Sequence, residues 1–228
     1  MFFDGANGYI DAGPTLDFPA WDQYSVSLWF LHNGGGYLGD YQYGQKMLDK
    51  TSWYHDWRLD LWPGGGSIGC IGLFIYENGA SYGMGGAPVN YMDNAWHHVV
   101  VTRDGTNGQF WVDGAITSSG GGMFSVYSDS DVCIGNSFSG DSYQQTCWSG
   151  MLDEVRVFDR ALSSNEVASL FMEGALRMTN SVVNQVSVST NLTVCGGLTV
   201  TGRVSFASGV FYSRPLGDLA CGIYTNVP

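Results

Sequence analysis

Three groups of residues have side chain types and spacings that could do chemistry. His97 and His98 are adjacent in NAWHHVVVTRDGTNGQFWVDG, residues 94–114. Acidic residues crowd into LDEVRVFD, which contains Asp153 and Glu154. Aromatic residues gather beside glycine and aspartate in GGGYLGDYQYGQ and SWYHDW. Histidine and carboxylate pairs can serve acid–base catalysis or metal binding, whereas exposed aromatic rings are typical of sugar-binding loops.

The histidine and carboxylate pairs fail the geometric requirement for catalysis. In a pleated strand successive side chains point to opposite faces, so His97 and His98 cannot act as a dyad or as paired ligands. Asp153 and Glu154 are separated in the same way, and the Glu-x-Asp-x-x-Glu spacing of two-carboxylate glycanases is missing. The sequence therefore predicts a protein that is not an enzyme. Glu154 and Arg156, two residues apart, predict a structural ion pair.

The elements that position these residues are predicted to be strands. Apolar and polar residues alternate in short runs separated by Gly, Asn and Asp clusters, the spacing of a β-sandwich. The predicted strands are residues 2–11, 24–30, 46–52, 57–62, 70–76, 96–103, 109–112, 132–135 and 151–158. RDGTNG predicts a hairpin loop and Asp113-Gly114 a second turn.

One helix is predicted after the last of these strands. Ser163 and Glu166 form the capping-box pattern, and Leu162 can pack on Val167. The buried stripe is expected to be Val167, Leu170 and Phe171, and Gly174 is expected to end the helix.

Composition limits the partners. The chain has 228 residues, 14% aromatic and 13% charged, with 33 glycines, which fits one sizeable all-β domain or a domain plus an appendage. Its net charge of −12, with only 9 Lys and Arg, argues against nucleic acid and anionic membranes. No apolar run approaches the roughly 18 residues of a membrane helix. No signal peptide is predicted at the start.

Five cysteines show no metal or redox spacing. Cys133 and Cys147 could form a disulfide across one hairpin, and buried free thiols are the alternative. An odd number leaves at least one thiol free or paired between chains, and Cys195 or Cys221 is expected to be that one.

Four blocks carry a family resemblance. FFDGANGYIDAG, YSVSLWF, NAWHHVVVTRDGTNGQFWVDG and GMLDEVRVFDRALSSNEVASLF occur in this order. Together they resemble a concanavalin A-like, laminin G-like (pentraxin-like) jelly roll over residues 1–176. The resemblance implies a sandwich of two curved antiparallel sheets. The predicted fold is therefore an all-β jelly-roll sandwich with one short helix, plus a β-rich C-terminal extension.

The resemblance also points to a structural calcium ion. Some family members bind calcium where the first and last strands lie side by side, which makes Asp4 and Asp153 the candidate ligands, since calcium prefers oxygen donors. The alternative is that these carboxylates cap turns. Asp129 and Asp131, in the loop sequence SDSD, are a separate candidate.

The aromatic loops supply the candidate ligand-binding residues. A glycan or a surface protein is the expected ligand, with the alternative that some of these rings fill the core or an interface. The candidates are Tyr37, Asp40, Tyr41, Trp53, Tyr54, His55 and Trp57.

The last part of the chain, residues 177–228, differs in charge and pattern. It holds three arginines and one aspartate, which gives +2 and leaves −14 on residues 1–176. A six-residue period of apolar residues runs through it, and NLTVCGGLTVTGRVSF resembles repeats of phage tail fibres and bacterial surface proteins. The pattern predicts an assembly segment, with two or three ordinary paired strands as the alternative. The predicted assembly residues are Val186, Leu192, Leu198, Val204 and Val210.

Two functions follow as hypotheses. The first is an extracellular or surface-displayed recognition and adhesion module, at a cell or virion surface, attached through residues 177–228 to a larger assembly. The second is a structural subunit of an extracellular filament, appendage or virion fibre, which assembles with copies of itself as a homo-oligomer.

Overall fold

A computed structural model describes residues 1–14, 16–36, 44–52, 55–62, 69–85, 89–137, 146–178, 211–213 and 222–224. The chain forms two compact units, Met1–Val182 and Val183–Pro228. The strands of the first unit are β1 Phe2–Asp4, β2 Ile10–Asp11, β3 Gln23–His32, β4 Gln45–Asp49, β5 His55–Trp62, β6 Cys70–Glu77, β7 Ala80–Gly85, β8 Trp96–Asp104, β9 Asn107–Val112, β10 Ala115–Gly120, β11 Cys133–Ile134 and β12 Ser149–Phe158. Its helices are the short 3₁₀ helix η1, Phe18–Ala20, and α1, Ser164–Met178.

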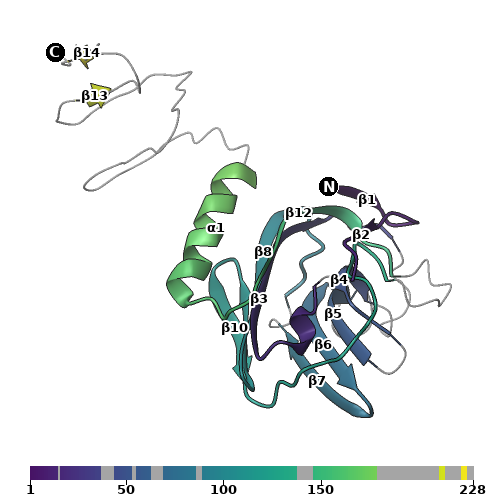
Figure 1. Ribbon diagram of the computed structural model, residues 1–228. Helices are drawn as coiled ribbons and strands as arrows, with labels where there is room; N and C mark the ends of the chain where they lie inside the picture. The colour runs from purple at the N-terminus through teal and green to yellow at the C-terminus, as the bar shows by residue number, and fades with distance from the viewer. Residues whose placement is uncertain are drawn as a thin grey trace. The chain divides into compact units, whose positions relative to one another are not determined.

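The first unit is a sandwich of two antiparallel sheets (Figure 1). Sheet A has the order β1-β12-β3-β8-β9-β10, and sheet B has the order β2-β11-β4-β5-β6-β7. Strands far apart in sequence are neighbours, since β12 pairs with both β1 and β3. The predicted two-sheet all-β sandwich with one short α-helix is confirmed.

Alternation along the strands builds the core between the sheets. In β3 the alternate residues Tyr24, Val26, Leu28 and Phe30 are fully buried and face sheet B. The side chains of β5 that meet them include Trp57, which is packed edge-on against Phe18 and Tyr24. A period of two thus directs every second residue of each central strand into one shared core.

Helix α1 covers the outer face of sheet A, so β3 is buried on both faces (Figure 1). The predicted capping box is confirmed: Ser163 N donates to Glu166 Oε2 at 2.9 Å and Glu166 N to Ser163 Oγ at 3.4 Å. Val167 packs with Leu162 on Val100 and Trp111, which are residues of sheet A.

The predicted helix end at Gly174 is wrong, because α1 continues to Met178. Gly174 serves close packing instead of termination. A Cβ at this position would lie 2.0 Å from Nε1 of Trp29, so only glycine lets the helix rest on that indole. Phe171 stacks on the same indole at 5.7 Å between ring centroids.

Two other strand predictions need correction. The predicted strand over residues 2–11 is divided between β1 in sheet A and β2 in sheet B. The turn between them begins at Asp4, whose Oδ1 accepts hydrogen bonds from the amides of Ala6 and Asn7. Strands β7 and β10 were not predicted, because ASYGMG and AITSSG lack apolar alternation; each lies at the edge of a sheet and pairs with one neighbour.

The predicted hairpin and the opposite orientation of the two histidines are confirmed. Strands β8 and β9 pair through the turn at Gly105, and Asp113 and Gly114 both have positive φ in the next turn. His97 contacts the rings of Phe30 and Tyr91 on one face of β8. His98 stacks on Trp29 on the other face.

In the second unit the described residues form one two-stranded antiparallel sheet. It pairs β13, Phe211–Ser213, with β14, Gly222–Tyr224. The predicted assembly residues Val186, Leu192, Leu198, Val204 and Val210 lie outside the described residues.

Candidate functional site

The outer face of sheet B carries a run of charged side chains that β5 sets in place. Within HDWRLDLW the residues Trp57, Leu59 and Leu61 face the core. The residues between them, Asp56, Arg58 and Asp60, therefore lie on the opposite face. A base flanked at two residues on either side by an acid is the starting point of an ion-pair network.

Arg58 is the centre of this network. Its Nη1 donates to Asp56 Oδ2, and its Nε lies 3.2 Å from Asp60 Oδ2. From β4, Lys46 Nζ donates to the same Asp60 oxygen at 2.9 Å. The guanidinium lies over the ring of Phe74 on β6, 4.2 Å from the ring centroid, a cation–π arrangement. We call Lys46, Asp56, Arg58, Asp60 and Phe74 the Arg58 network.

The Arg58 network retains unused hydrogen-bonding capacity. Asp60 Oδ1 and Arg58 Nε are buried, and among the described residues neither has a hydrogen-bond partner. Buried polar atoms are nearly always paired, so such atoms call for a partner. The side chains of Arg58 and Asp56 are 22% and 12% exposed, which leaves part of the network in contact with solvent.

A hydrogen-bond chain continues from Asp56 to Asp49. Thr51 Oγ1 lies 2.7 Å from Asp56 Oδ1 and 2.9 Å from Asp49 Oδ2. Ser137 Oγ donates to Asp49 Oδ1 at 3.0 Å. Burial is the main reason that the pKa of Asp49 is raised to about 6.

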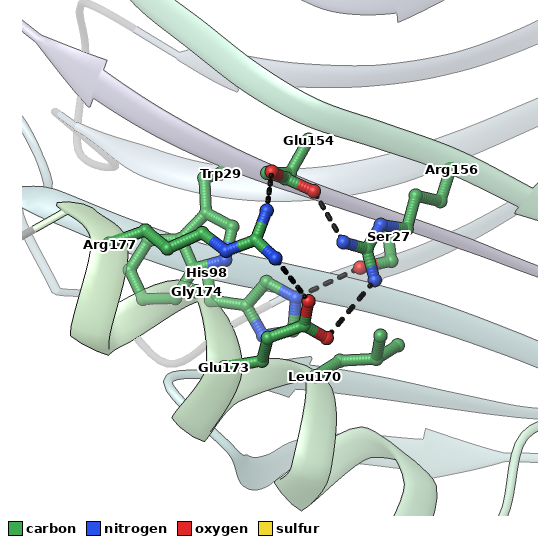
Figure 2. A pocket seen from close by; sticks show the side chains of 9 residues that line it. All are labelled: Ser27, Trp29, His98, Glu154, Arg156, Leu170, Glu173, Gly174 and Arg177. Carbon is green, nitrogen blue, oxygen red and sulfur yellow. Dashed lines mark hydrogen bonds and ion pairs between the residues drawn. The ribbon is translucent and has the colours of Figure 1, made fainter. Parts of the chain in front are cut away.

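The outer face of sheet A is instead closed by α1, leaving a small recess with room for about one water molecule. Figure 2 shows the side chains that line it: Ser27, Trp29, His98, Glu154, Arg156, Leu170, Glu173, Gly174 and Arg177. Two acids and two bases alternate around it in a closed ring of ion pairs. Arg177 contacts Glu154 at 3.0 Å and Glu173 at 2.8 Å, and Arg156 contacts the same two acids.

The ring is built by a bulge in β12. Glu154 has a positive φ of 50°, and the register of β12 against β3 shifts between Asp153 and Arg156. The predicted pair of Glu154 with Arg156 is confirmed. Beneath the ring, Ser27 Oγ lies 2.9 Å from His98 Nε2, and burial lowers the pKa of His98 to about 4.

A sequence profile identifies the family to which this two-sheet sandwich belongs. The profile described as the Concanavalin A-like lectin/glucanases superfamily matches residues 4–168, well over half of the chain. The chain belongs to this superfamily. The resemblance predicted from the four sequence blocks is therefore confirmed. No curated protein sequence matches the chain.

Solved structures share the fold of the concanavalin A-like domain at low sequence identity. A native heptameric SAP-like pentraxin from Limulus polyphemus has a TM-score of 0.52 at 16% identity, covering 75% of this chain and 80% of the pentraxin. Domain 4 of AbnA, a GH43 extracellular arabinanase from Geobacillus stearothermophilus in complex with arabinotriose, gives 0.55 at 20%, with 74% of each chain covered. The botulinum neurotoxin serotype G binding domain gives 0.56 at 16%, covering 76% of this chain and 42% of the toxin domain.

Few of the predicted ligand-binding residues can be placed on the concanavalin A-like domain. Tyr37, Asp40, Tyr41, Trp53 and Tyr54 lie outside the described residues.

Trp57 is a core residue and not a surface ring, which corrects its prediction as a ligand contact. It is 0% exposed, and its Nε1 donates to Tyr24 Oη at 2.8 Å. His55 is half-buried, and its Nδ1 lies 2.7 Å from Glu77 Oε2. Neither residue stacks in the open.

The predicted calcium ligands are not brought together. In the ladder Asp4 is opposite Ser149, which is four residues before Asp153 and thus about 13 Å from it along β12. Asp4 caps the turn after β1, and Asp153 Oδ1 accepts a hydrogen bond from the backbone N–H of Glu154. Among the described residues no cluster of three or more His, Cys, Asp or Glu residues could hold a metal. Calcium stays a prediction, and these two carboxylates cannot share one ion.

The loop containing Asp129 and Asp131 is already contacted by a cation. Lys50 Nζ donates to Ser130 O at 2.7 Å and lies 3.7 Å from Asp17. A calcium ion beside this loop would meet that ammonium group.

Cys133 and Cys147 are free and buried, as is Cys70, so the structure has the alternative of buried thiols and not the hairpin disulfide. Trp148 N donates to Gly135 O at 2.8 Å, which leaves Cys147 about three residues, or roughly 10 Å, from Cys133 along the pairing. A disulfide requires Cα atoms within about 7 Å. Cys195 and Cys221 lie outside the described residues.

The Arg58 network itself was missed in the sequence, although its signal is present there. In DWRLDL every second residue is charged while the residues between are apolar. The aromatic residues of SWYHDW indicate sugar stacking, whereas the signal of the network is the charge at every second position.

Proposed function

We propose that the concanavalin A-like domain is a non-enzymatic recognition module that binds an uncharged glycan at the outer face of sheet B, around the Arg58 network. The observation that supports this most strongly is that the guanidinium of Arg58 lies over the ring of Phe74 while its side chain remains 22% exposed. Sugar hydroxyls can accept hydrogen bonds from the exposed N–H groups of Arg58 and donate to the Asp56 carboxylate, whose side chain is 12% exposed. Phe74 and the guanidinium above it provide the planar surface that sugar rings favour.

The charges of the Arg58 network favour a neutral ligand. Two carboxylates, Asp56 and Asp60, are balanced by Lys46 and Arg58. An anionic glycan would meet those carboxylates, and a cationic one would compete with the two bases. The arabinanase domain of similar fold was solved with arabinotriose, an uncharged sugar, which supports a glycan as the ligand class.

The test is retention on a panel of immobilised polysaccharides, with arabinan, xylan, β-glucan and galactomannan as neutral members and pectate as an acidic one. Two matched variants accompany the native chain. Arg58→Lys keeps the charge but loses the planar fork, and Arg160→Lys makes the same change at an exposed pair with Glu166 outside sheet B.

We expect a neutral polysaccharide to retain the native chain and Arg160→Lys equally, and Arg58→Lys at least about tenfold less tightly, as expected for one lost bidentate contact. If no polysaccharide is bound and a surface protein is captured through the same face, the ligand class is wrong. If both variants bind like the native chain, the site is wrong.

We further propose that the module acts outside the cell or at a cell or virion surface, and that residues 177–228 attach it to a larger assembly. The charge difference supports the attachment, because a segment of +2 can associate with the acidic surface of a partner. Among the described residues no helix is long and apolar enough to cross a membrane.

The second candidate function is a structural subunit of a filament, appendage or virion fibre. The six-residue period of apolar residues favours it, since such repeats bury their side chains by stacking on neighbouring copies. Molecular mass in solution separates the two functions. Trimers or filaments that survive dilution, and that are lost when the chain ends at Val182, would favour assembly, whereas a monomer bound to polysaccharide would favour recognition.

A further inference from the structure

The Thr51 hydroxyl lies between two carboxyl groups but has only one hydrogen to donate. Its Oγ1 is 2.9 Å from Asp49 Oδ2 and 2.7 Å from Asp56 Oδ1. If both acids were ionised, two oxygen lone pairs would face each other in one of these contacts, with no hydrogen between them. The arrangement is fully bonded only when one acid is protonated and donates to Thr51, while Thr51 donates to the other.

Asp49 is the acid that holds this proton. Arg58 donates to Asp56, which stabilises the ionised form of that carboxylate. No described Lys, Arg or His makes an ion pair with Asp49, which is 1% exposed.

The groups around Asp49 come from its own strand β4, from β5, β11 and β2, and from the segment that follows β11. Lys46 on β4 already pairs with Asp60, and Asp56 and Arg58 are on β5, where Arg58 is the cross-strand neighbour of Asp49. On β11, Cys133 is its cross-strand neighbour, and Asp11 on β2 lies beyond Cys133. After β11, Ser137 donates to Asp49 Oδ1. Cys133 is itself kept neutral, since burial raises the pKa of its thiol to about 12.

Charge balance makes the proton on Asp49 important to the whole network. With Asp49 neutral, the two cations Lys46 and Arg58 match the two anions Asp56 and Asp60. Ionisation leaves a net charge of −1 in a buried position and a third carboxylate that attracts the same cations. The guanidinium over Phe74 is then shared between Asp49 and its present partners.

We propose that Asp49 is a proton-linked regulator of the glycan site, so that the Arg58 network binds its ligand at mildly acidic pH and releases it as Asp49 ionises. This inference rests on the proposed function for its ligand and on Asp49, Thr51 and Asp56 for its mechanism. Burial, the largest cause, raises the pKa of Asp49 to about 6, which sets the pH at which the change occurs.

The first measurement needs no ligand. Aspartate side-chain carboxyl ¹³C shifts of the full chain are recorded from pH 4 to 8, and Asp49 is assigned from the signal lost in Asp49→Asn. We expect one aspartate to titrate near pH 6 and Thr51→Val to move that midpoint by half a pH unit or more, because the shared hydrogen bond is lost. If Asp49 titrates near pH 4, the proposal is overturned whatever the glycan results are.

The second measurement uses soluble arabinan as the probe, at pH 5 and pH 7.5. The native chain and the exposed control Asp129→Asn are expected to bind at least about fivefold more tightly at pH 5, a typical coupling between two sites. In Asp49→Asn, which mimics the protonated acid, the ratio should fall to about one. If the ratio of affinities at pH 5 and pH 7.5 in Asp49→Asn equals that of the native chain, the proposed regulation is wrong. Failure of every chain to bind arabinan or any polysaccharide of the panel, with the titration near pH 6 intact, would count against the proposed function and its regulation but leave the shared proton supported.

Discussion

The two outer faces of the sandwich show how similar alternating sequences can serve different purposes. On sheet A the outward residues Ser27, Trp29 and His98 are covered by α1, and the ion-pair ring closes over them (Figure 2). On sheet B the outward residues Asp56, Arg58 and Asp60 pair with one another, and the Arg58 side chain remains 22% exposed. Among the described residues each face has a buried atom without a hydrogen-bond partner, His98 Nδ1 on sheet A and Asp60 Oδ1 on sheet B. The first face is closed by a helix, whereas the second is the one that we propose binds a ligand, so buried polarity alone does not identify a site.

The largest expected loss of stability comes from removing one charge from the outer face of sheet B. Lys46→Met removes one of two cations from Asp60, whose side chain is 0% exposed. We expect the free energy of unfolding to fall by about 3–5 kcal/mol, measured by urea denaturation, because a buried charge loses a partner. The double variant Lys46→Met/Asp60→Leu should recover most of it. A loss below about 1 kcal/mol for the single variant would show that the pair is not tightly coupled.

The next effect is a pH dependence on the covered face of sheet A. His98 has a pKa of about 4 in the folded chain against 6.5 when exposed, mainly because of burial. The stability that its neutral form provides is complete above pH 6.5 and declines as pH falls toward 4, by about 3 kcal/mol. His98→Gln should remove this decline from the difference between variant and native unfolding profiles.

His97, on the other face of β8, provides the control with the opposite sign. Burial lowers its pKa, but hydrogen bonds and charges from Asp113 and Asp93 outweigh burial and raise it overall. Its contribution is complete below pH 6.5 and is lost as pH rises through the raised pKa. If His97→Gln and His98→Gln gave difference profiles of the same sign, the two faces would not differ as described.

A smaller effect tests how closely α1 covers sheet A. Gly174→Ala places a Cβ 2.0 Å from Trp29 Nε1, and we expect about 2 kcal/mol of destabilisation in thermal or urea unfolding. Gly83→Ala on β7 is the matched control, because nothing lies within 4 Å of its Cβ. Equal stability of the two variants would mean that the helix can shift away from the sheet at little cost.

Opening the ion-pair ring should lower the free energy of unfolding by a smaller amount. In Glu154→Gln the ring loses one acid whose side chain is 23% exposed, and we expect a loss below about 1 kcal/mol that diminishes at high salt. Unfolding measured at low and at 1 M NaCl checks this. A loss of several kcal/mol at both salt concentrations would mean that the ring, and not the apolar contacts, holds α1 in place.

The smallest expected effect is that of a chelator. Because Asp4 and Asp153 are too far apart to share an ion, EDTA should change the melting temperature by less than about 1 °C. A drop of several degrees that CaCl₂ restores, and that Asp4→Asn abolishes, would establish the calcium site after all.

The strands can be predicted from the sequence because apolar–polar alternation depends only on the polarity of each residue. The sequence predicts the opposite orientations of His97 and His98 and the capping box of α1, both confirmed. The same alternation places Trp57 with Leu59 and Leu61 on the core face, although the aromatic residues beside Trp57 favoured its prediction as a ligand contact.

Features that depend on tertiary contacts could not be predicted. The bulge at Glu154 re-aims a side chain without any local signal, and Gly174 resembles a helix end until the indole of Trp29 is placed against it. The Arg58 network required knowing that β4, β5 and β6 are adjacent, since Lys46 and Phe74 come from the outer two of these strands.

One measurement tests most directly whether the two faces have different roles. The full chain labelled with ¹⁵N is titrated with the polysaccharide that retains it, and changes in amide chemical shift are mapped. We predict that the largest changes fall at Lys46, Arg58 and Phe74 on sheet B, while Val167 of α1 and Leu162 just before it, which pack on sheet A, stay unchanged. Changes concentrated at α1 and its contacts on sheet A would contradict the account.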